Sequence, residues 1–395
     1  MKRIQGGITA PTGFTAAGVA CGIKGSAKDL AIIASEEPCF AAGVFTTNRV
    51  KAAPVQITRR RVRDVVIAHA VVVNSGNANC CTGEKGLRDA RRMADLCGEV
   101  LGVPPEEVLV ASTGPIGRFL PMEKVERGIR RAASMLRKRG GREAAEAILT
   151  TDTVTKQIAV TERIGGAEVR IGAMAKGAGM IEPNMATMLA FITTDAVIDR
   201  QAFSELLANA VNKSFNRVTV DGDRSTNDMV IALANGLCEN KMILLGAGRE
   251  LFQEALDFVC SELAKMIVRD GEGATKFIEV TVKGARSPRD ADRAARAIAN
   301  SALVKTALHG GSANWGRIMA ALGYSGASIK PHLVDIYLRG VKVASGGEPV
   351  DYDASKLSKA LKRKEIEVVA DLNLGKFEQT VWTCDLSEEY VAVNV

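Results

Sequence analysis

The stretch Lys176–Asp195, KGAGMIEPNMATMLAFITTD, constrains the fold more than any other part of the sequence. Gly177 and Gly179 leave the backbone free of Cβ constraints, and the proline that follows fixes the direction of the chain. The apolar run Met188–Ile192 then predicts a core strand with Thr187 at its start. A Gly-rich loop that enters a buried strand is a sufficient structural explanation, so local composition alone does not require a functional site.

Thr187 is also placed for chemistry. If the chain were cut between Ala186 and Thr187, Thr187 would gain a free α-amino group with a pKa of about 7.7 to 8.0. This amine is a base close enough to activate its own hydroxyl. The stretch is therefore also a candidate for a buried cleavage and catalytic site.

The composition is that of a globular protein with an aliphatic core. The chain has 395 residues, of which 47% are hydrophobic, but aromatic residues make up only 4% and glycines number 38. Packing should rest on Ala, Val, Ile and Leu between many tight turns, which favours an α/β layered fold. The length suits two or three domains, yet no low-complexity linker or short-period repeat divides the chain.

The net charge of +7 and the sequence pI near 9.0 raise the question of nucleic-acid binding. Basic residues concentrate at Arg59–Arg63 and Arg127–Arg142. Apolar residues at Val125, Ile129 and Leu136 predict that the second segment is an amphipathic helix with its charges on the solvated face. No aromatic residues interleave with these charges, so we expect no nucleic-acid partner. The positive field can instead steer an anionic substrate.

The cysteines and histidines argue against a metal site. Eight Cys are spread along the chain without a CxxC pair, and only three His are present. This spacing is atypical of a zinc site or a disulfide framework and typical of reduced thiols. The N-terminus lacks the apolar region of a signal peptide, and no run of about eighteen apolar residues exists. We therefore expect a cytoplasmic protein with no metal and no membrane partner.

Hydrophobic periodicity predicts alternating strands and helices along the rest of the chain. Strands are expected at Ile67–Val73, Val108–Ala111, Val169–Ile171, Phe277–Val282, Leu333–Leu338 and Ile366–Asp371, and Ser214–Asp228 is expected to be a strand followed by a polar loop. Helices are expected at Phe203–Val211, Leu251–Ile267 and Ala291–Val304.

Two loops that directly follow strands carry polar groups. The amides of Asn74–Asn79 either face a site or form a plain turn. Thr113 and Gly114 come at the carboxyl end of a short strand, where backbone N–H groups and a hydroxyl can converge on an anion. His69 is interpreted as a satisfied core histidine. The Gly-rich loop Arg269–Lys276 follows a helix and precedes a strand, the reverse of a P-loop, so we do not expect a nucleotide there.

Taken together, the motifs resemble the ornithine acetyltransferase family of arginine biosynthesis, whose members are sometimes bifunctional as N-acetylglutamate synthases. The resemblance covers nearly the whole chain. It is carried by GGITAPTGFTAAGVACGIK, AAGVFTTNRVKAAPV, VVVNSGNANCCTG, STGPIG, TTDT, KGAGMIEPNMATMLAFITTDA, FNRVTVDGDRSTND, IVRDGEGATK, NWGRIMAALGYSG and CDLSEEYVAVN. So many matches in the same order make chance implausible.

The resemblance implies an αββα-type sandwich and a self-processing enzyme of the N-terminal-nucleophile kind. Cleavage before the Thr of MATML would give an alpha chain of residues 1–186 and a beta chain of residues 187–395, with two copies of each in a heterotetramer. Thr187 then corresponds to the nucleophile that is acetylated. Thr113 and Gly114 correspond to the oxyanion hole, which holds the tetrahedral intermediate through fixed donors.

The resemblance also implies the substrates. The substrate-binding positions that match the family are Thr150, Lys176, Thr187, Glu272 and Asn394. N2-acetylornithine carries an α-carboxylate and a δ-ammonium, for which Lys176 and Glu272 are complementary partners. Glutamate would then accept the acetyl group from Thr187 in a ping-pong reaction. No metal or redox cofactor is needed. Acetyl-CoA is a further candidate acetyl donor, and no residue of the sequence argues for or against it.

The chain departs from the family pattern at two places. Family members usually continue past the position of Asn394 to a Ser or Thr that also contacts substrate, whereas this sequence ends at Val395. Ser312 and Ala313 stand where an Asp-Pro pair is commoner, which changes the expected geometry of that turn.

Two other functions remain open from the sequence. The first is an N-terminal-nucleophile aminopeptidase or amidohydrolase of the same fold, in which water resolves the acyl-enzyme. The set Lys176, Glu272 and Asn394 argues against it because these residues suit an amino-acid acceptor. The second is a non-catalytic binding protein, against which the intact KGAGMIEPNMATML motif argues.

Overall fold

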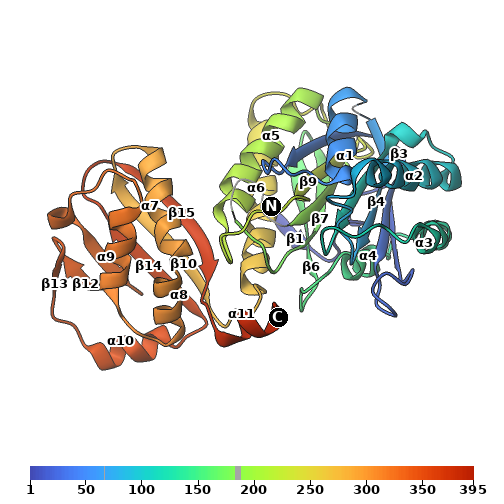
Figure 1. Cartoon of the computed structure of the whole chain (residues 1–395). Coiled ribbons are helices and arrows are strands. Elements are labelled where there is room, and N and C mark those ends of the chain that lie inside the picture. The colour runs from blue at the N-terminus through green and yellow to red at the C-terminus, as the bar shows by residue number, and fades with distance from the viewer. Residues whose placement is uncertain (66, 183–187) are drawn as a thin grey trace. The chain divides into compact units, whose positions relative to one another are not determined.

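The computed structural model describes residues 1–65, 67–182 and 188–395 of the chain. These residues form two compact units, each with its own sheet (Figure 1). The described residues of the first unit are 1–65, 67–178, 188–216 and 224–267, and those of the second unit are 179–182, 217–223 and 268–395. Both units therefore draw on residues from either side of the expected cleavage point.

The first unit is built on a mixed sheet with the order β1-β6-β7-β8-β9-β3-β4-β5, in which β2 also pairs with β3. The strands are β1 (Lys2–Ile4), β2 (Phe14–Val19), β3 (Leu30–Phe45), β4 (Ile67–Ser75), β5 (Val108–Thr113), β6 (Lys156–Ile164), β7 (Ala167–Lys176), β8 (Leu189–Thr194) and β9 (Met229–Ala234). The long strand β3 joins the two halves of the sheet. Its residues Leu30–Ala34 pair with β2 and β4, and its residues Phe40–Phe45 pair with β9.

The helices of the first unit are α1 (Ala53–Asp64), α2 (Gly83–Leu101), α3 (Met122–Ser134), α4 (Gly141–Ala147), α5 (Arg200–Lys213) and α6 (Ala247–Arg269), the last of which continues into the second unit. Local sequence explains several of their ends. Asp199 caps α5 by accepting the N–H of Ala202, and Gly102 ends α2 in the left-handed conformation with φ of 71°.

Alternation along β3, β4 and β5 divides the first unit into layers, because successive side chains point to opposite faces of a strand. One face packs against α2 and α3 through Ile32, Val72, Val110, Met93 and Ile129. The other face shares a core with β7, β8 and β9 through Ile33, Val71, Leu109, Met174, Phe191 and Ile231. The two halves of the sheet thus face each other, which confirms the expected α/β layered fold.

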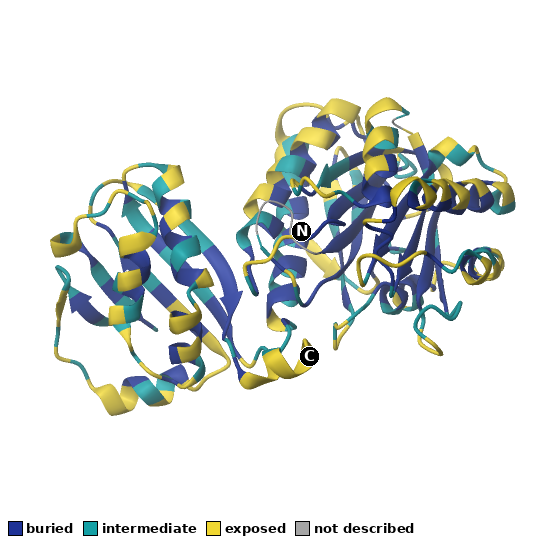
Figure 2. Cartoon of the chain, in the orientation of Figure 1, coloured by how far each residue is buried: buried dark blue, intermediate teal, exposed yellow. Residues whose placement is uncertain are grey.

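The second unit has a sheet of order β13-β12-β11-β14-β10-β15. Its strands are β10 (Phe277–Ala285), β11 (Asp335–Leu338), β12 (Val341–Ser345), β13 (Glu348–Pro349), β14 (Glu365–Asp371) and β15 (Phe377–Cys384). Its helices are α7 (Pro288–Asn300), α8 (Ala302–His309), α9 (Trp315–Tyr324), α10 (Ala354–Leu361) and α11 (Glu388–Val393). Strand β10 buries Ile278, Val280 and Val282 against α7, while the residues between them are only partly covered. Figure 2 shows the same contrast between buried strands and the exposed outer faces of helices.

Three expected elements differ from the structure. Ser214–Asp228 contains no extended strand; it begins with a 3-10 turn at Phe215–Arg217, and Val218 makes only an isolated bridge. The helix expected at Ala291–Val304 is two helices, because Ser301 caps the second by accepting the N–H of Val304. The basic helix expected up to Arg142 ends at Ser134, and α4 follows separately.

In the described part of the chain, no helix is both long enough and apolar enough to cross a membrane.

Candidate active site

The end of β5 forms a turn that only glycine can occupy. Thr113, the last residue of β5, is 4% exposed, and its carbonyl accepts the N–H of Asn77 at 3.0 Å. Gly114 has φ of 137°, and a Cβ at this position would lie 2.4 Å from the nitrogen of Asn77 and 2.6 Å from the carbonyl carbon of Gly76. The sequence predicts that Thr113 and Gly114 lie at the carboxyl end of a strand, and the structure places them there.

The amides after β4 shape this turn. Asn74 donates from Nδ2 to the carbonyl of Asn77 at 2.9 Å, and the N–H of Asn79 donates to Oδ1 of Asn77 at 2.8 Å. Asn227, which sequence reasoning missed, donates from Nδ2 to the carbonyls of Ala78 and Ser112 at 2.7 and 2.8 Å. These amides hold the backbone that supports Gly114. Their contacts correspond more closely to a rigid turn than to a row of ligand-binding groups.

Lys176, which is buried at the end of β7, forms a pair with the partly buried Thr150. Lys176 is 2% exposed, and its Nζ donates to Oγ1 of Thr150 at 2.8 Å. In the antiparallel pairing of β7 with β8, Lys176 lies opposite Leu189, only two residues after Thr187 in the sequence. The hydroxyl of Ser75 donates to the carbonyl of Ala147 at 2.7 Å, which ties the end of β4 to the segment that leads to Thr150.

Asp152 is the counter-charge that allows lysines to gather here. Its side chain is fully buried and lies 2.7 Å from Nζ of Lys156 and 3.7 Å from Nζ of Lys176. It also accepts the N–H of Gly177 at 2.6 Å and the N–H of Thr150 at 3.1 Å. Burial acts to raise the pKa of Asp152, but Lys176 and Lys156 together outweigh it and hold the pKa well below its ordinary value. Sequence reasoning missed both Asp152 and Lys156, although the TTDT motif contains the aspartate.

The expected cleavage residues Ala186 and Thr187 lie outside the residues that the structure describes. The first described residue after them, Met188, donates its N–H to Oδ1 of Asp228 at 3.0 Å. Asp228 is fully buried; burial raises its pKa well above its usual range, although the N–H of Met188 acts in the opposite direction. The start of β8 is thus held by a buried carboxyl group that sequence reasoning did not select.

In the second unit, Glu272 and Asn394 contact each other. Nδ2 of Asn394 donates to Oε2 of Glu272 at 2.9 Å. Gly179 lies against the same carboxylate, since a Cβ there would be 2.2 Å from Oε2 of Glu272. The structure therefore brings together two of the expected substrate residues and the second glycine of the KGAG motif.

Carboxylates surround Tyr390 near this pair. Asp221 accepts the N–H groups of Met180 and Ile181 at 2.5 and 2.9 Å, which fixes the segment after Gly179. Burial raises the pKa of Tyr390 to about 12, and the negative charges of Asp221 and Glu272 act in the same direction. This part of the second unit thus favours a positively charged ligand group.

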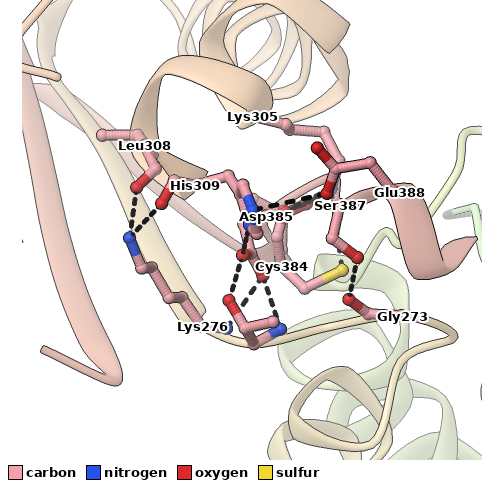
Figure 3. A network of polar contacts seen from close by, with 11 residues as sticks. Gly273, Lys276, Lys305, Leu308, His309, Cys384, Asp385, Ser387 and Glu388 are labelled. Atoms are coloured by element: carbon pink, nitrogen blue, oxygen red, sulfur yellow. Dashed lines mark hydrogen bonds and ion pairs between the residues drawn. The ribbon is translucent and has the colours of Figure 1, made fainter. Parts of the chain in front are cut away.

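A partly buried polar network connects the loop that carries Glu272 to the segment that carries Asn394 (Figure 3). Asp385 accepts the N–H groups of Thr275 and Lys276 at 2.8 Å each, and it lies 2.7 Å from Nδ1 of His309. Ser387 donates from Oγ to the carbonyl of Gly273 at 2.6 Å. The loop and the C-terminal segment are therefore held as one rigid piece.

Two further expectations concern histidines and metals. His69 is only partly buried and pairs through Nδ1 with the carboxylate of Glu107, so it is satisfied but does not lie in the core. Within residues 1–65, 67–182 and 188–395, no group of three or more His, Cys, Asp or Glu side chains is placed to hold a metal ion.

The sequence matches the family model described as the ArgJ family over residues 15–395. It is 55% identical over 398 residues to an arginine biosynthesis bifunctional protein ArgJ from Symbiobacterium thermophilum, with 100% of this chain and 99% of that protein covered. It is 48% identical over 405 residues to a glutamate N-acetyltransferase from Methanocaldococcus jannaschii, with 100% and 99% covered.

Among solved structures, the fold is similar to a crystal structure of the ArgJ protein from Bacillus halodurans. The TM-score is 0.51 and the sequence identity is 41%, and the match covers 52% of this chain and 97% of that chain. The match of the family model to nearly the whole chain, together with relatives that are about half identical over its full length, shows that this chain belongs to the ArgJ family.

Proposed function

We propose that the chain is a glutamate N-acetyltransferase that transfers the acetyl group of N2-acetyl-L-ornithine to L-glutamate in arginine biosynthesis. One observation carries the proposal furthest. The buried Lys176, which bonds to Thr150, lies at the end of β7 opposite Leu189 and hence beside the strand that follows Thr187. A cation fixed at this point suits a substrate with a carboxylate next to the acetylated amine.

The proposed first half-reaction forms acetyl-Thr187. Oγ of Thr187 attacks the acetyl carbonyl carbon of N2-acetylornithine, and its proton passes to the α-amine of Thr187. Thr113 and Gly114 stabilise the oxyanion. The C–N bond then breaks, the proton moves from the Thr187 amine to the leaving nitrogen, and ornithine departs.

The second half-reaction returns the enzyme to its starting form. The α-amine of glutamate attacks the ester carbonyl of acetyl-Thr187, and the bond to Oγ breaks. The proton lost by the glutamate nitrogen returns to Oγ through the Thr187 amine. The products are N-acetylglutamate and the free enzyme, with no net change in protonation of the site.

This mechanism requires that the chain first cut itself between Ala186 and Thr187, because only then does Thr187 have a free amine. The products would be the chains 1–186 and 187–395. We further propose that two copies of each form a heterotetramer in the cytoplasm. The cytoplasmic location is supported by the eight cysteines, which are spread along the sequence without a CxxC pair, as is typical of reduced thiols.

An N-terminal-nucleophile hydrolase is the alternative, but the relatives at 48% to 55% identity do not favour it. The test is to incubate the purified protein with glutamate and N2-acetylornithine, with acetyl-CoA as a separate donor, and to measure N-acetylglutamate. We expect transfer from N2-acetylornithine. Release of free acetate without N-acetylglutamate would instead support the hydrolase. The acetyl-CoA reaction decides whether the protein has the second activity.

A further inference from the structure

A buried carboxylate organises the loop that contains Lys24. Asp29 is fully buried, and its side chain accepts four backbone N–H groups, those of Cys21, Gly22, Ile23 and Lys24, at 2.6, 3.1, 2.6 and 2.9 Å. The carbonyl of Asp29 also accepts the N–H of Ser75 at the end of β4, at 2.8 Å. The backbone of Lys24 is therefore fixed relative to the turn that precedes Gly114.

The side chain of Lys24 runs from this turn to the Lys176–Thr150 pair. A Cβ on Gly76 would lie 2.6 Å from Cγ of Lys24, so the aliphatic part of the lysine packs directly on Gly76. Nζ of Lys24 donates to the carbonyl of Leu149 at 2.6 Å, one residue before Thr150. Lys24 thus contacts both parts of the candidate site in the first unit.

The surroundings of Lys24 leave its charge incompletely compensated. Burial lowers the pKa of Lys24, the charges of Asp29 and Asp152 act to raise it, and the charge of Lys176 acts to lower it. Asp29 is occupied by its four backbone donors, and Asp152 lies closest to Lys156. Nζ of Lys24 donates to a neutral carbonyl, that of Leu149, and a carboxylate in its place would form a stronger charge-assisted bond.

The two proposed substrates differ in the charge of their side chains. Ornithine carries a side-chain ammonium, whereas glutamate carries a side-chain carboxylate. The acceptor therefore needs a cation that the donor does not need. Lys176 cannot meet this need alone, because both substrates bring an α-carboxylate.

We propose that Lys24 binds the side-chain carboxylate of glutamate and so selects the acetyl acceptor. The assignment rests on the proposed function, because it assumes that glutamate is the acceptor. Lys24 gives up its contact with the carbonyl of Leu149 and takes the carboxylate in its place. It serves the second half-reaction and leaves the formation of acetyl-Thr187 largely unaffected.

The experiment compares glutamate with glutamine as acceptors in the same preparation of Lys24→Met. Glutamine has nearly the same shape but lacks the side-chain charge. In the unaltered protein, kcat/KM should be at least about tenfold higher for glutamate, the range expected for a hydrogen bond between charged groups. In Lys24→Met this preference should fall to nearly one, while the rate of acetyl-Thr187 formation from N2-acetylornithine should change less than about threefold.

Two other variants provide controls. Lys28→Met removes a nearby lysine that pairs with Glu146 and is 35% exposed, and it should keep the full preference for glutamate. Lys24→Arg keeps the charge and should retain most of the preference. The acceptor ratio does not depend on the folded fraction, since both acceptors are measured on one sample.

The outcomes separate this inference from the proposed function. A full preference for glutamate in Lys24→Met, or an equal loss with both acceptors, would overturn the role of Lys24. A loss confined to acetyl-Thr187 formation would overturn it as well. If the unaltered protein forms no acetyl-Thr187 or transfers nothing to glutamate, the proposed function itself fails.

Discussion

In the first unit the expected substrate residues lie among lysines, whereas in the second unit they lie among carboxylates. The lysines meant in the first unit are Lys176 itself and its neighbours Lys24 and Lys156, which gather around Asp152. The carboxylates meant in the second unit are Glu272 itself, Asp221 and Asp223, all of which act on the pKa of Tyr390. The lysines of the first region suit a carboxylate as ligand group, and the carboxylates of the second region suit an ammonium.

The two regions also differ in how their like charges are held. In the first unit, one buried aspartate, Asp152, offsets neighbouring lysines through direct ion pairs. In the second unit, neutral donors stabilise the negative charges. The amide of Asn394 donates to Glu272, and the N–H groups of Met180 and Ile181 donate to Asp221. We infer that the lysine region is the more sensitive of the two to loss of a single residue, because its compensation depends on one carboxylate.

The largest effect is expected from Thr187→Ala, because Thr187 is the proposed nucleophile of both self-cleavage and acetyl transfer. The variant should remain a single chain of 395 residues and show no acetyl transfer. Gel electrophoresis and the N-acetylglutamate assay measure the two effects. Thr306→Ala, an exposed threonine on α8, should cleave and react normally. A cleaved and active Thr187→Ala protein would refute the assignment.

Gly114→Ala should have the next largest effect. The added Cβ would meet the nitrogen of Asn77 and the carbonyl carbon of Gly76, so the turn that holds the proposed oxyanion donors must move. Loss of such a donor typically lowers kcat by about 10² to 10³. Gly117→Ala is the matched control: it also has positive φ, of 80°, but nothing lies within 4 Å of the added Cβ. Equal kcat values for the two variants would remove Gly114 from the oxyanion hole.

Asp152→Asn tests the counter-charge of the lysine region. It leaves Lys156, whose side chain is fully buried, without its carboxylate, which should cost about 3 kcal/mol of unfolding free energy at pH 7. The pKa of Asp152 in the folded protein lies below its ordinary value of 3.8. The contribution of its charge is therefore complete above pH 3.8 and is lost as pH falls through the lower folded pKa.

Urea unfolding from pH 7 downward measures this prediction. The difference between Asp152→Asn and the unaltered protein should stay constant until about pH 4 and then shrink. Asp64→Asn removes an exposed carboxylate that pairs with Arg60 and Arg63, and its effect should be much smaller. A difference between Asp152→Asn and the unaltered protein that grows on acidification would contradict the account.

The smallest effect is expected from variants that remove one charged side chain from each region. Lys176→Met should raise KM by about tenfold for both N2-acetylornithine and glutamate, because both carry an α-carboxylate. Glu272→Gln should raise KM by a similar factor for N2-acetylornithine only, because glutamate has no ammonium on its side chain. Initial-rate kinetics with each substrate varied in turn distinguishes these patterns. Identical patterns for the two variants would break the contrast between the regions.

Short strands and their apolar alternation were predictable from the sequence because their signals are local. The strand predicted at Ile67–Val73 is confirmed within β4, and that at Val108–Ala111 within β5. The break between α7 and α8 was missed, because apolar spacing continues through Ser301 and only its capping bond shows that one helix ends there. Ser214–Asp228 was predicted to start as a strand, but in the structure it pairs only through an isolated bridge between Val218 and Trp382 of β15.

The candidate site shows the same division. Thr113, Gly114, Thr150 and Lys176 were identified through motifs that the sequence displays directly. Their supporting residues were not, because Asp152 matters only once folding brings it to the lysines on β6 and β7. Asp228, Asn227 and Lys24 act through contacts with residues far away in the chain, which no local pattern encodes.

The central claim is that Thr187 becomes acetylated, and the mass of the intact protein tests it most directly. After brief exposure to N2-acetylornithine without glutamate, the chain 187–395 should gain the mass of one acetyl group, located on its first residue by peptide fragmentation. Added glutamate should remove that group and yield N-acetylglutamate. An uncut chain, or a cut chain whose mass does not change with N2-acetylornithine, would contradict the account.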